Sequence, residues 1–118
     1  MDFDQWSVIL LCRPERPPHL DDTTSATLQD AHLAFLAKTH DEGALLAAGP
    51  TEGDPAGEVV GICVYGIPAQ KARAIAEKDP KVVAGVLRVV ALDWSVPAGS
   101  VRFPPSRFPR SMQEVRPD

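Results

Sequence analysis

The sequence predicts an α+β fold in which a four-stranded antiparallel sheet carries two helices on one face. Two observations lead to it. Four short apolar segments have the composition of strands, and two others have the 3.6-residue period of helices. Their order is strand, helix, strand, strand, helix, strand. The chain has 118 residues, the size of one domain, and its 44% of apolar and 24% of charged residues exclude disorder throughout.

The first strand is expected over residues 5–13, QWSVILLCR, and a proline-rich loop follows it. From about 25 to 42 the apolar residues adopt helical spacing. Thr24 or Ser25 can cap the start of this helix, and Gly43 suits the left-handed position after its end. One face of the helix carries Leu28, Ala31, His32, Phe35, Leu36 and Thr39.

The second half of the fold follows from two strand signals, a helix signal and a last strand. Segments 44–51, ALLAAGPT, and 59–66, VVGICVYG, predict a hairpin around a long polar tip. The segment PAQKARAIAEKD suits a helix that ends by about Lys78, because the residue before Pro80 is pushed out of the helical region. PKVVAG fits one further helical turn, and 86–96 is the last strand.

This succession is typical of the ferredoxin-like βαββαβ sandwich, with both helices on one face of the sheet. Its strands, however, are apolar on both sides: Val8 and Leu10 point one way, Ile9 and Leu11 the other. Two helices cover only one face, and a large bare apolar face is abnormal for a monomer. We therefore expect a homodimer with its sheets face to face. The alternative is that the C-terminal segment covers the second face.

The C-terminal segment differs from the rest of the chain. Residues 1–96 form the predicted domain, whereas 97–118 are rich in proline and arginine, which disfavours regular structure. Val101, Phe103 and Phe108 could anchor an extended arm to the body or to a partner subunit. A disordered end is the alternative.

Charge and composition exclude several classes of function. The net charge of −4 argues against a nucleic-acid surface, and no apolar run approaches the roughly 20 residues of a membrane span. The acidic start lacks signal-peptide character, so we expect the cytoplasm. Cys12 and Cys63 lie inside strands, where they suit reduced, buried thiols. No metal-ligand spacing and no glycine-rich phosphate loop is present, so no metal or cofactor is expected.

The candidate chemistry centres on His32, which lies inside an apolar helical stripe. It is either a satisfied core residue or an acid–base group, because burial and a neighbouring carboxylate shift an imidazole in opposite directions. Asp79 is the candidate carboxylate, since it shares the inner face of its helix with Ala72, Ile75 and Ala76. Asp79 could equally cap the turn that begins at Pro80. Both interpretations stay open at the level of the residues.

Three other polar residues attract attention. His40 lies at the edge of the apolar stripe, where we expect it to be solvated, and His19 lies in the proline-rich loop. Asp93 beside Trp94 suggests a buried polar pair on the last strand.

Three segments, HLAFL, ALLAAGP and DPKVVAGV, resemble the YCII (YciI-like) family in order and spacing, over about four fifths of the chain. The resemblance implies a ferredoxin-like fold that pairs as a dimeric α+β barrel. It also implies that His32 and Asp79 form an active-site dyad and that Gly49 and Pro50 shape the pocket wall. Where family members often carry an aromatic residue after the Asp-Pro pair, this chain has Lys81, which could place a substrate-binding cation at the pocket mouth.

The resemblance also implies a class of activity. Some relatives look like dehydrochlorinases or lyases that act on small hydroxylated aromatics. Our first hypothesis is therefore a cofactor-free lyase or isomerase, in which His32 moves a proton on a small polar cyclic metabolite and Asp79 orients its ring. The alternative is a non-enzymatic module that binds or presents a small molecule in the same cleft. A purely structural dimer is a third reading.

Overall fold

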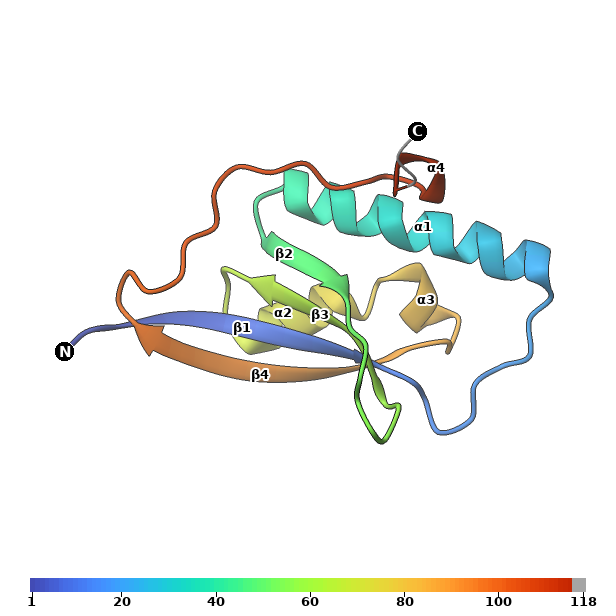
Figure 1. Ribbon diagram of the computed structural model, residues 1–118, viewed down its shortest axis with the longest axis horizontal. Helices are drawn as coiled ribbons and strands as arrows, with labels where there is room; N and C mark the ends of the chain where they lie inside the picture. The colour runs from blue at the N-terminus through green and yellow to red at the C-terminus, as the bar shows by residue number, and fades with distance from the viewer. Residues whose placement is uncertain (116–118) are drawn as a thin grey trace.

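The computed structural model describes residues 1–115 and confirms the predicted α+β fold (Figure 1). Four strands form one sheet in the order β2-β3-β1-β4, and every neighbouring pair is antiparallel. This is the ferredoxin-like arrangement. The elements are β1 (Phe3–Cys12), α1 (Asp22–Asp41), β2 (Leu45–Pro50), β3 (Val59–Tyr65), α2 (Ala69–Ala76), α3 (Pro80–Val83), β4 (Arg88–Pro97) and α4 (Met112–Val115).

The core lies between the sheet and helices α1 and α2. Ile9 on the central strand β1 stands opposite Cys63 on β3 and Ala91 on β4, and its side chain is fully buried. Helix α2 presents the small, buried residues Ala72 and Ala76 to this layer, which lets its backbone lie close to the sheet. The alternation of β1 therefore places one set of its side chains in the core and the other on the opposite face.

Helix α1 begins three residues earlier than the sequence pattern predicts. The residue at its N-cap is Asp21, whose carboxylate accepts a hydrogen bond from the Thr24 backbone N–H at 2.7 Å. This bond lowers the pKa of Asp21 below its usual value. The expectation that Thr24 or Ser25 caps the helix is wrong, because Asp21 is an equally good cap and lies further upstream. At the other end Gly43 adopts the expected positive φ of 92°.

Among the helices of residues 1–115, none covers the second face of the sheet. Its most exposed apolar side chains are Ile62, Leu92 and Trp94, with 38%, 46% and 38% of their surface accessible. We call this surface the open face. By alternation from Ser7 and Ile9, it also carries Val8, Leu10 and Trp6. None of the helices described in residues 1–115 is long and apolar enough to cross a membrane.

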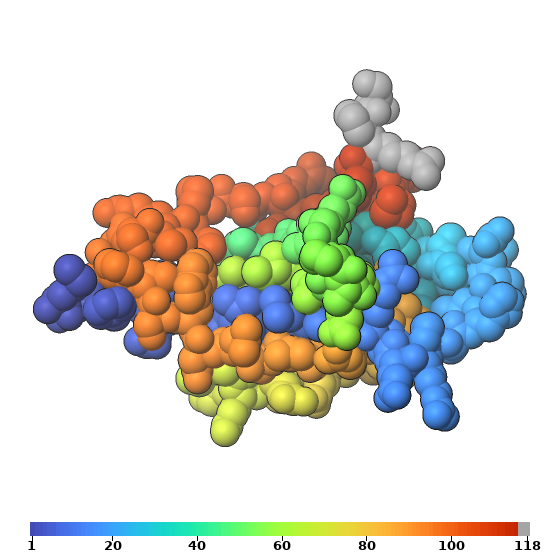
Figure 2. All heavy atoms as spheres, turned by 60° about the horizontal axis from the view of Figure 1, so that its bottom comes forward, coloured from blue at the N-terminus to red at the C-terminus, as the bar shows by residue number. Residues whose placement is uncertain are grey.

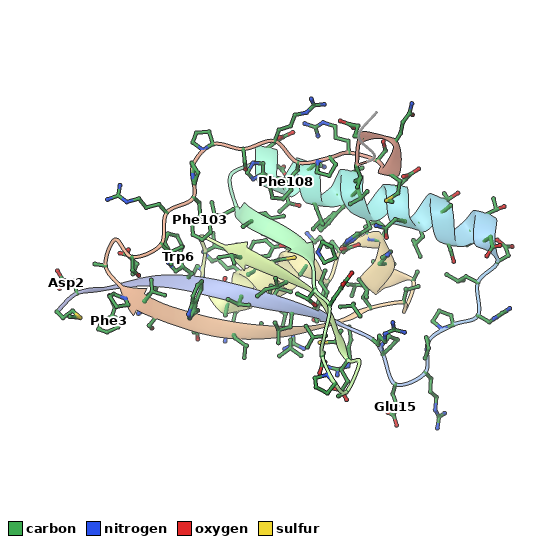
Figure 3. The ribbon with its side chains drawn as sticks, viewed as in Figure 1. Asp2, Phe3, Trp6, Glu15, Phe103 and Phe108 are labelled. Atoms are coloured by element: carbon green, nitrogen blue, oxygen red, sulfur yellow. The ribbon has the colours of Figure 1, made fainter. Side chains whose placement is uncertain are left out.

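The C-terminal arm runs back along α1 (Figure 1) instead of spreading across the open face. Figure 2 shows it as an orange-to-red band along the upper edge of the body. Phe103 meets Trp6 edge to face at 4.9 Å between ring centroids, and Phe108 reaches the C-terminal end of α1 (Figure 3). The arm thus touches the open face at Trp6 and leaves Leu92 and Trp94 exposed. One short helix, α4, interrupts its otherwise irregular course, and residues 116–118 of the predicted arm lie outside the described residues.

Candidate functional site

The structure brings His32 and Asp79 into direct contact. His32 Nδ1 and Asp79 Oδ2 are 2.6 Å apart, and only 10% and 2% of the two side chains are accessible. His32 projects from the middle of α1, and Asp79 from the junction between α2 and α3. Two residues that are 47 positions apart in sequence therefore form a buried hydrogen-bonded pair.

Local sequence explains the position of Asp79. Helix α2 ends at Ala76, and Pro80 begins α3 in the first helical position, where its missing N–H costs nothing. Asp79 is the N-cap between them, and Oδ1 accepts the backbone N–H of Lys81 at 2.9 Å. The two oxygens thus perform both functions that the sequence left open. Oδ1 caps α3, while Oδ2 holds the ring of His32.

The hydrogen bond fixes the orientation of the imidazole. A carboxylate accepts hydrogen bonds, so Nδ1 of His32 carries the proton and Nε2 holds the lone pair when the ring is neutral. Nε2 has no hydrogen-bond partner among the described residues. Within residues 1–115, Trp6 Nε1 is the one side-chain nitrogen or oxygen that is both fully buried and without a hydrogen-bond partner. Since Nε2 of His32 also lacks a partner but is not such an atom, it must still reach the surface. A ring held at one nitrogen and open at the other can accept or deliver a proton.

The groups around Asp79 lie in a poorly solvated layer. Burial raises the pKa of the Cys63 thiol to about 12, with a smaller contribution from the charge of Asp79. Burial also raises the pKa of Tyr65, to which Cys63 and Asp79 add. Lys81 is half-buried, and this burial lowers its pKa while Asp79 opposes the change. Cys63 and Tyr65 were not predicted as neighbours of the site, although their alternation on the core side of β3 could have indicated it.

Gly49 and Pro50 lie at the end of β2, the strand on which α1 packs. Lys81 follows Asp79 by two residues and lies in the first turn of α3. No hydrogen bond joins Gly49 or Pro50 to the pair within residues 1–115.

Two sequence expectations about polar residues are wrong. His40 is not a solvated ring: Nδ1 lies 2.8 Å from the Leu45 carbonyl oxygen and Nε2 lies 3.0 Å from that of Ser106. Asp93 and Trp94 are not a buried pair, because both are exposed on β4. The helical pattern could not reveal that the arm returns to His40. Alternation alone could not show that Asp93 and Trp94 lie on a solvent-exposed edge strand.

Two surface hollows lie along the arm, and neither includes His32 or Asp79. The larger, about 650 Å³, runs between the start of β1 and residues 99–104. The smaller, about 450 Å³, is lined by Arg107, Phe108 and the α4 turn. Within residues 1–115, no three His, Cys, Asp or Glu side chains gather in a group that could hold a metal ion.

Comparison with known proteins assigns the family. The model of the YCII-related domain matches residues 8–95, three quarters of the chain. The chain belongs to the YCII-related domain family. Both His32 and Asp79 lie inside the matched part of this YCII-related chain, and the arm lies beyond it.

The chain was also compared with solved structures and with curated proteins. The YCII-related chain is similar to 5-chloro-2-hydroxyhydroquinone dehydrochlorinase from Burkholderia phenoliruptrix AC1100, solved with 2,5-dihydroxybenzoquinone. The TM-score is 0.48 and the identity 21%, over 74% of this chain and 92% of that one. Among curated proteins, none matches significantly.

The first prediction concerns the coupling between His32 and Asp79. Asp79→Asn keeps a good helix cap but removes the charge, so a double-mutant cycle with His32→Ala isolates the buried pair. We expect a coupling free energy of about 1–3 kcal/mol from urea unfolding. The exposed pair Arg73–Glu77 is the control, because its side chains are 54% and 51% accessible and its coupling should be near zero. Equal coupling in the two cycles would contradict a special role for the buried pair.

The second prediction uses the Cys63 thiol. Its folded pKa of about 12 lies above the ordinary value of 9.0, so its contribution to the free energy of unfolding is complete below pH 9 and disappears as pH rises towards 12. Urea unfolding at pH 8 and pH 10.5 should show a smaller loss of stability in Cys63→Ala than in the native chain. Cys12→Ala, which keeps Cys63, should behave like the native chain. If Cys63→Ala loses as much stability between pH 8 and pH 10.5 as the native chain, the Cys63 thiol is not the source of this pH dependence.

Proposed function

We propose that this YCII-related protein is a cofactor-free enzyme of the lyase or isomerase type, with His32 as its general acid–base group. The observation that carries the proposal is the buried His32–Asp79 hydrogen bond, together with the unpartnered Nε2 on the far side of the ring. Because Asp79 fixes one ring nitrogen and the other reaches the surface, the ring can exchange a proton with a bound substrate. The substrate class we favour is a small polar cyclic metabolite, as the family resemblance implies.

The proposed chemistry is proton transfer at carbon. Neutral His32 takes a proton from a carbon next to a substrate carbonyl, and the electrons of the broken C–H bond pass into an enolate. In a lyase these electrons then form a C=C bond as a leaving group departs with its own pair. In an isomerase the imidazolium returns the proton to another carbon. Asp79 stabilises the imidazolium throughout, because its carboxylate already faces Nδ1.

Lys81, Gly49 and Pro50 complete the proposed site. An ammonium close to Asp79, half-buried and without a carboxylate within ion-pair distance in residues 1–115, suits an anionic oxygen of the substrate. Gly49 and Pro50 would form the wall at the end of β2, where glycine leaves room for a ligand. These assignments are proposals, and they follow from the family resemblance.

We also propose a homodimer that pairs two open faces as an α+β barrel, in the cytoplasm. Exposed Ile62, Leu92 and Trp94 support it, since a contiguous apolar surface of this kind marks an interaction site. The course of the arm supports it as well, because the described arm leaves most of this face uncovered. In such a dimer the open faces of both sheets are shielded from water.

The alternative function is a non-enzymatic module that holds a small molecule at the same residues. It shares every residue of the proposed site but requires no proton transfer at Nε2. Turnover therefore separates the two functions, whereas ligand affinity alone does not.

The third prediction tests the enzyme. A panel of small hydroxylated quinones and lactones is assayed for turnover with the native chain, His32→Ala and Asp79→Asn. Removal of a general base should lower kcat by roughly 10² to 10⁴, with ligand affinity within about tenfold. His19→Ala is the matched control, because His19 lies exposed in the loop before α1 and should not affect turnover. Turnover that persists in His32→Ala contradicts the role of His32 as general base, and binding without turnover of any compound favours the alternative.

The fourth prediction tests the dimer. Light scattering during size-exclusion chromatography should give twice the chain mass for the native protein at micromolar concentration. Leu92→Lys places a charge on the open face and should give a monomer, because two lysines would meet in an apolar interface. Val83→Lys is the control, since Val83 is 72% exposed on α3, on the helix side, and should leave the dimer intact. A native monomer excludes the proposed pairing.

A further inference from the structure

Tyr65 ends β3 on the core side of the sheet, and only 1% of its surface is accessible. The core cluster that contains it also contains Leu36 of α1 and Ala76 of α2. Leu36 lies about one helical turn after His32, and Ala76 lies three residues before Asp79. Tyr65 is therefore packed among neighbours of both members of the buried pair.

The hydroxyl of Tyr65 has no partner within residues 1–115. It is not a fully buried, unpartnered atom either, since Trp6 Nε1 is the one such atom in that part of the chain. The hydroxyl therefore keeps part of the small accessible surface of its residue. Ser7, which stands opposite Tyr65 on β1, shows the usual arrangement of a buried hydroxyl: it donates to the Ile67 carbonyl oxygen at 2.7 Å.

The charge of Asp79 acts on the hydroxyl of Tyr65. Burial raises the pKa of Tyr65 above its usual value, and the charges of Cys63 and Asp79 add to this effect. A charge has such an effect only over a short distance in poorly solvated surroundings. The phenol stays protonated at neutral pH, so it can donate a hydrogen bond without carrying a charge.

Two unpartnered polar atoms thus lie near the carboxylate of Asp79. Nε2 of His32 can accept a proton, and the hydroxyl of Tyr65 can donate a hydrogen bond. Removal of a proton next to a carbonyl uses both, because the base takes the proton while a donor stabilises the oxygen that becomes negative. A buried hydroxyl without a partner costs folding free energy that a phenylalanine ring of nearly the same shape would not. A ligand therefore explains this hydroxyl better than packing does.

We propose that the Tyr65 hydroxyl donates a hydrogen bond to a carbonyl oxygen of the substrate bound at His32, and that this oxygen becomes an enolate during the reaction. The inference rests on the proposed function, since it takes Nε2 of His32 as the reacting atom. As His32 removes the C–H proton, the electron pair of that bond moves towards the carbonyl oxygen. The hydrogen bond from the phenol then strengthens, and the phenol keeps its own proton.

The fifth prediction tests this contact with p-nitrophenolate, whose phenolate oxygen resembles that of an enolate. Binding is measured by absorbance at pH 8.5 to the native chain, Tyr65→Phe and Ser7→Ala. Tyr65→Phe removes one hydroxyl and should weaken binding at least about tenfold, because a hydrogen bond to a charged oxygen is lost. Ser7→Ala is the matched control: its buried hydroxyl already has a partner, so binding should stay within about twofold.

Urea unfolding of the same variants separates a ligand contact from a structural role. Tyr65→Phe should be at least as stable as the native chain, since the lost hydroxyl has no partner within residues 1–115. Ser7→Ala should be less stable, because it leaves the Ile67 carbonyl without its donor. A loss of stability in Tyr65→Phe equal to that in Ser7→Ala would show that the protein itself uses the hydroxyl, and would overturn the proposal.

The native chain gives a direct readout, because Tyr65 is its one tyrosine. Labelling at tyrosine Cζ therefore yields a single carbon resonance, which should shift as p-nitrophenolate binds. Binding without this shift, equal binding by Tyr65→Phe, or no binding to the native chain at millimolar concentration overturns the proposal. If Tyr65→Phe does not fold, the resonance of the native chain alone decides.

The same variants distinguish this inference from the proposed function. Suppose that p-nitrophenolate binding depends on Tyr65 but no compound of the third prediction is turned over. The contact then stands and the enzyme fails. Suppose instead that a compound is turned over and that Tyr65→Phe keeps both the native kcat and the native binding. The enzyme then stands and the role of Tyr65 fails.

Discussion

The carboxylate of Asp79 is the group on which the arrangement of the helices depends. It is almost completely buried, and a buried carboxylate is tolerated only where donors satisfy it. One donor is a backbone N–H in α3 and the other a ring N–H in α1. The junction between α2 and α3 therefore has to lie under the middle of α1. Loss of either donor leaves charge in the core, so the same interaction that positions the imidazole also holds the helical layer together.

Much of this arrangement could be predicted from the chain itself. Helical spacing put His32 and Asp79 on inward faces, and the Asp-Pro pair predicted a cap, because these signals are local and repeat along each helix. The cap of α1 was misplaced since several residues in the row from Asp21 to Ser25 are suitable caps, and propensity does not choose among them. Local patterns equally could not tell whether Asp79 caps α3 or contacts His32, and the structure shows both contacts, with one oxygen each.

The errors share a physical origin in long-range contacts. His40 was expected in water because its partners, the Leu45 carbonyl and the arm, are not visible in the period of α1. Asp93 was expected to be buried because an aromatic neighbour suggested a core, yet β4 is an edge strand with its polar positions in solvent. The family relation covers residues 8–95 and so gives no guidance on the arm. Tertiary position, rather than residue type, decides the environment of each of these side chains.

The path of the arm bears on the order in which the protein folds. Within residues 1–115, the hydrogen bonds between the arm and α1 join residues 66 to 83 positions apart, whereas His32 meets Asp79 across 47. The fully buried core cluster lies between Ile9 and Val89 and includes no residue of the arm. The body can therefore form its core without the arm, which then closes over a surface that already exists. Docking of the arm is in this sense an event separable from folding of the body.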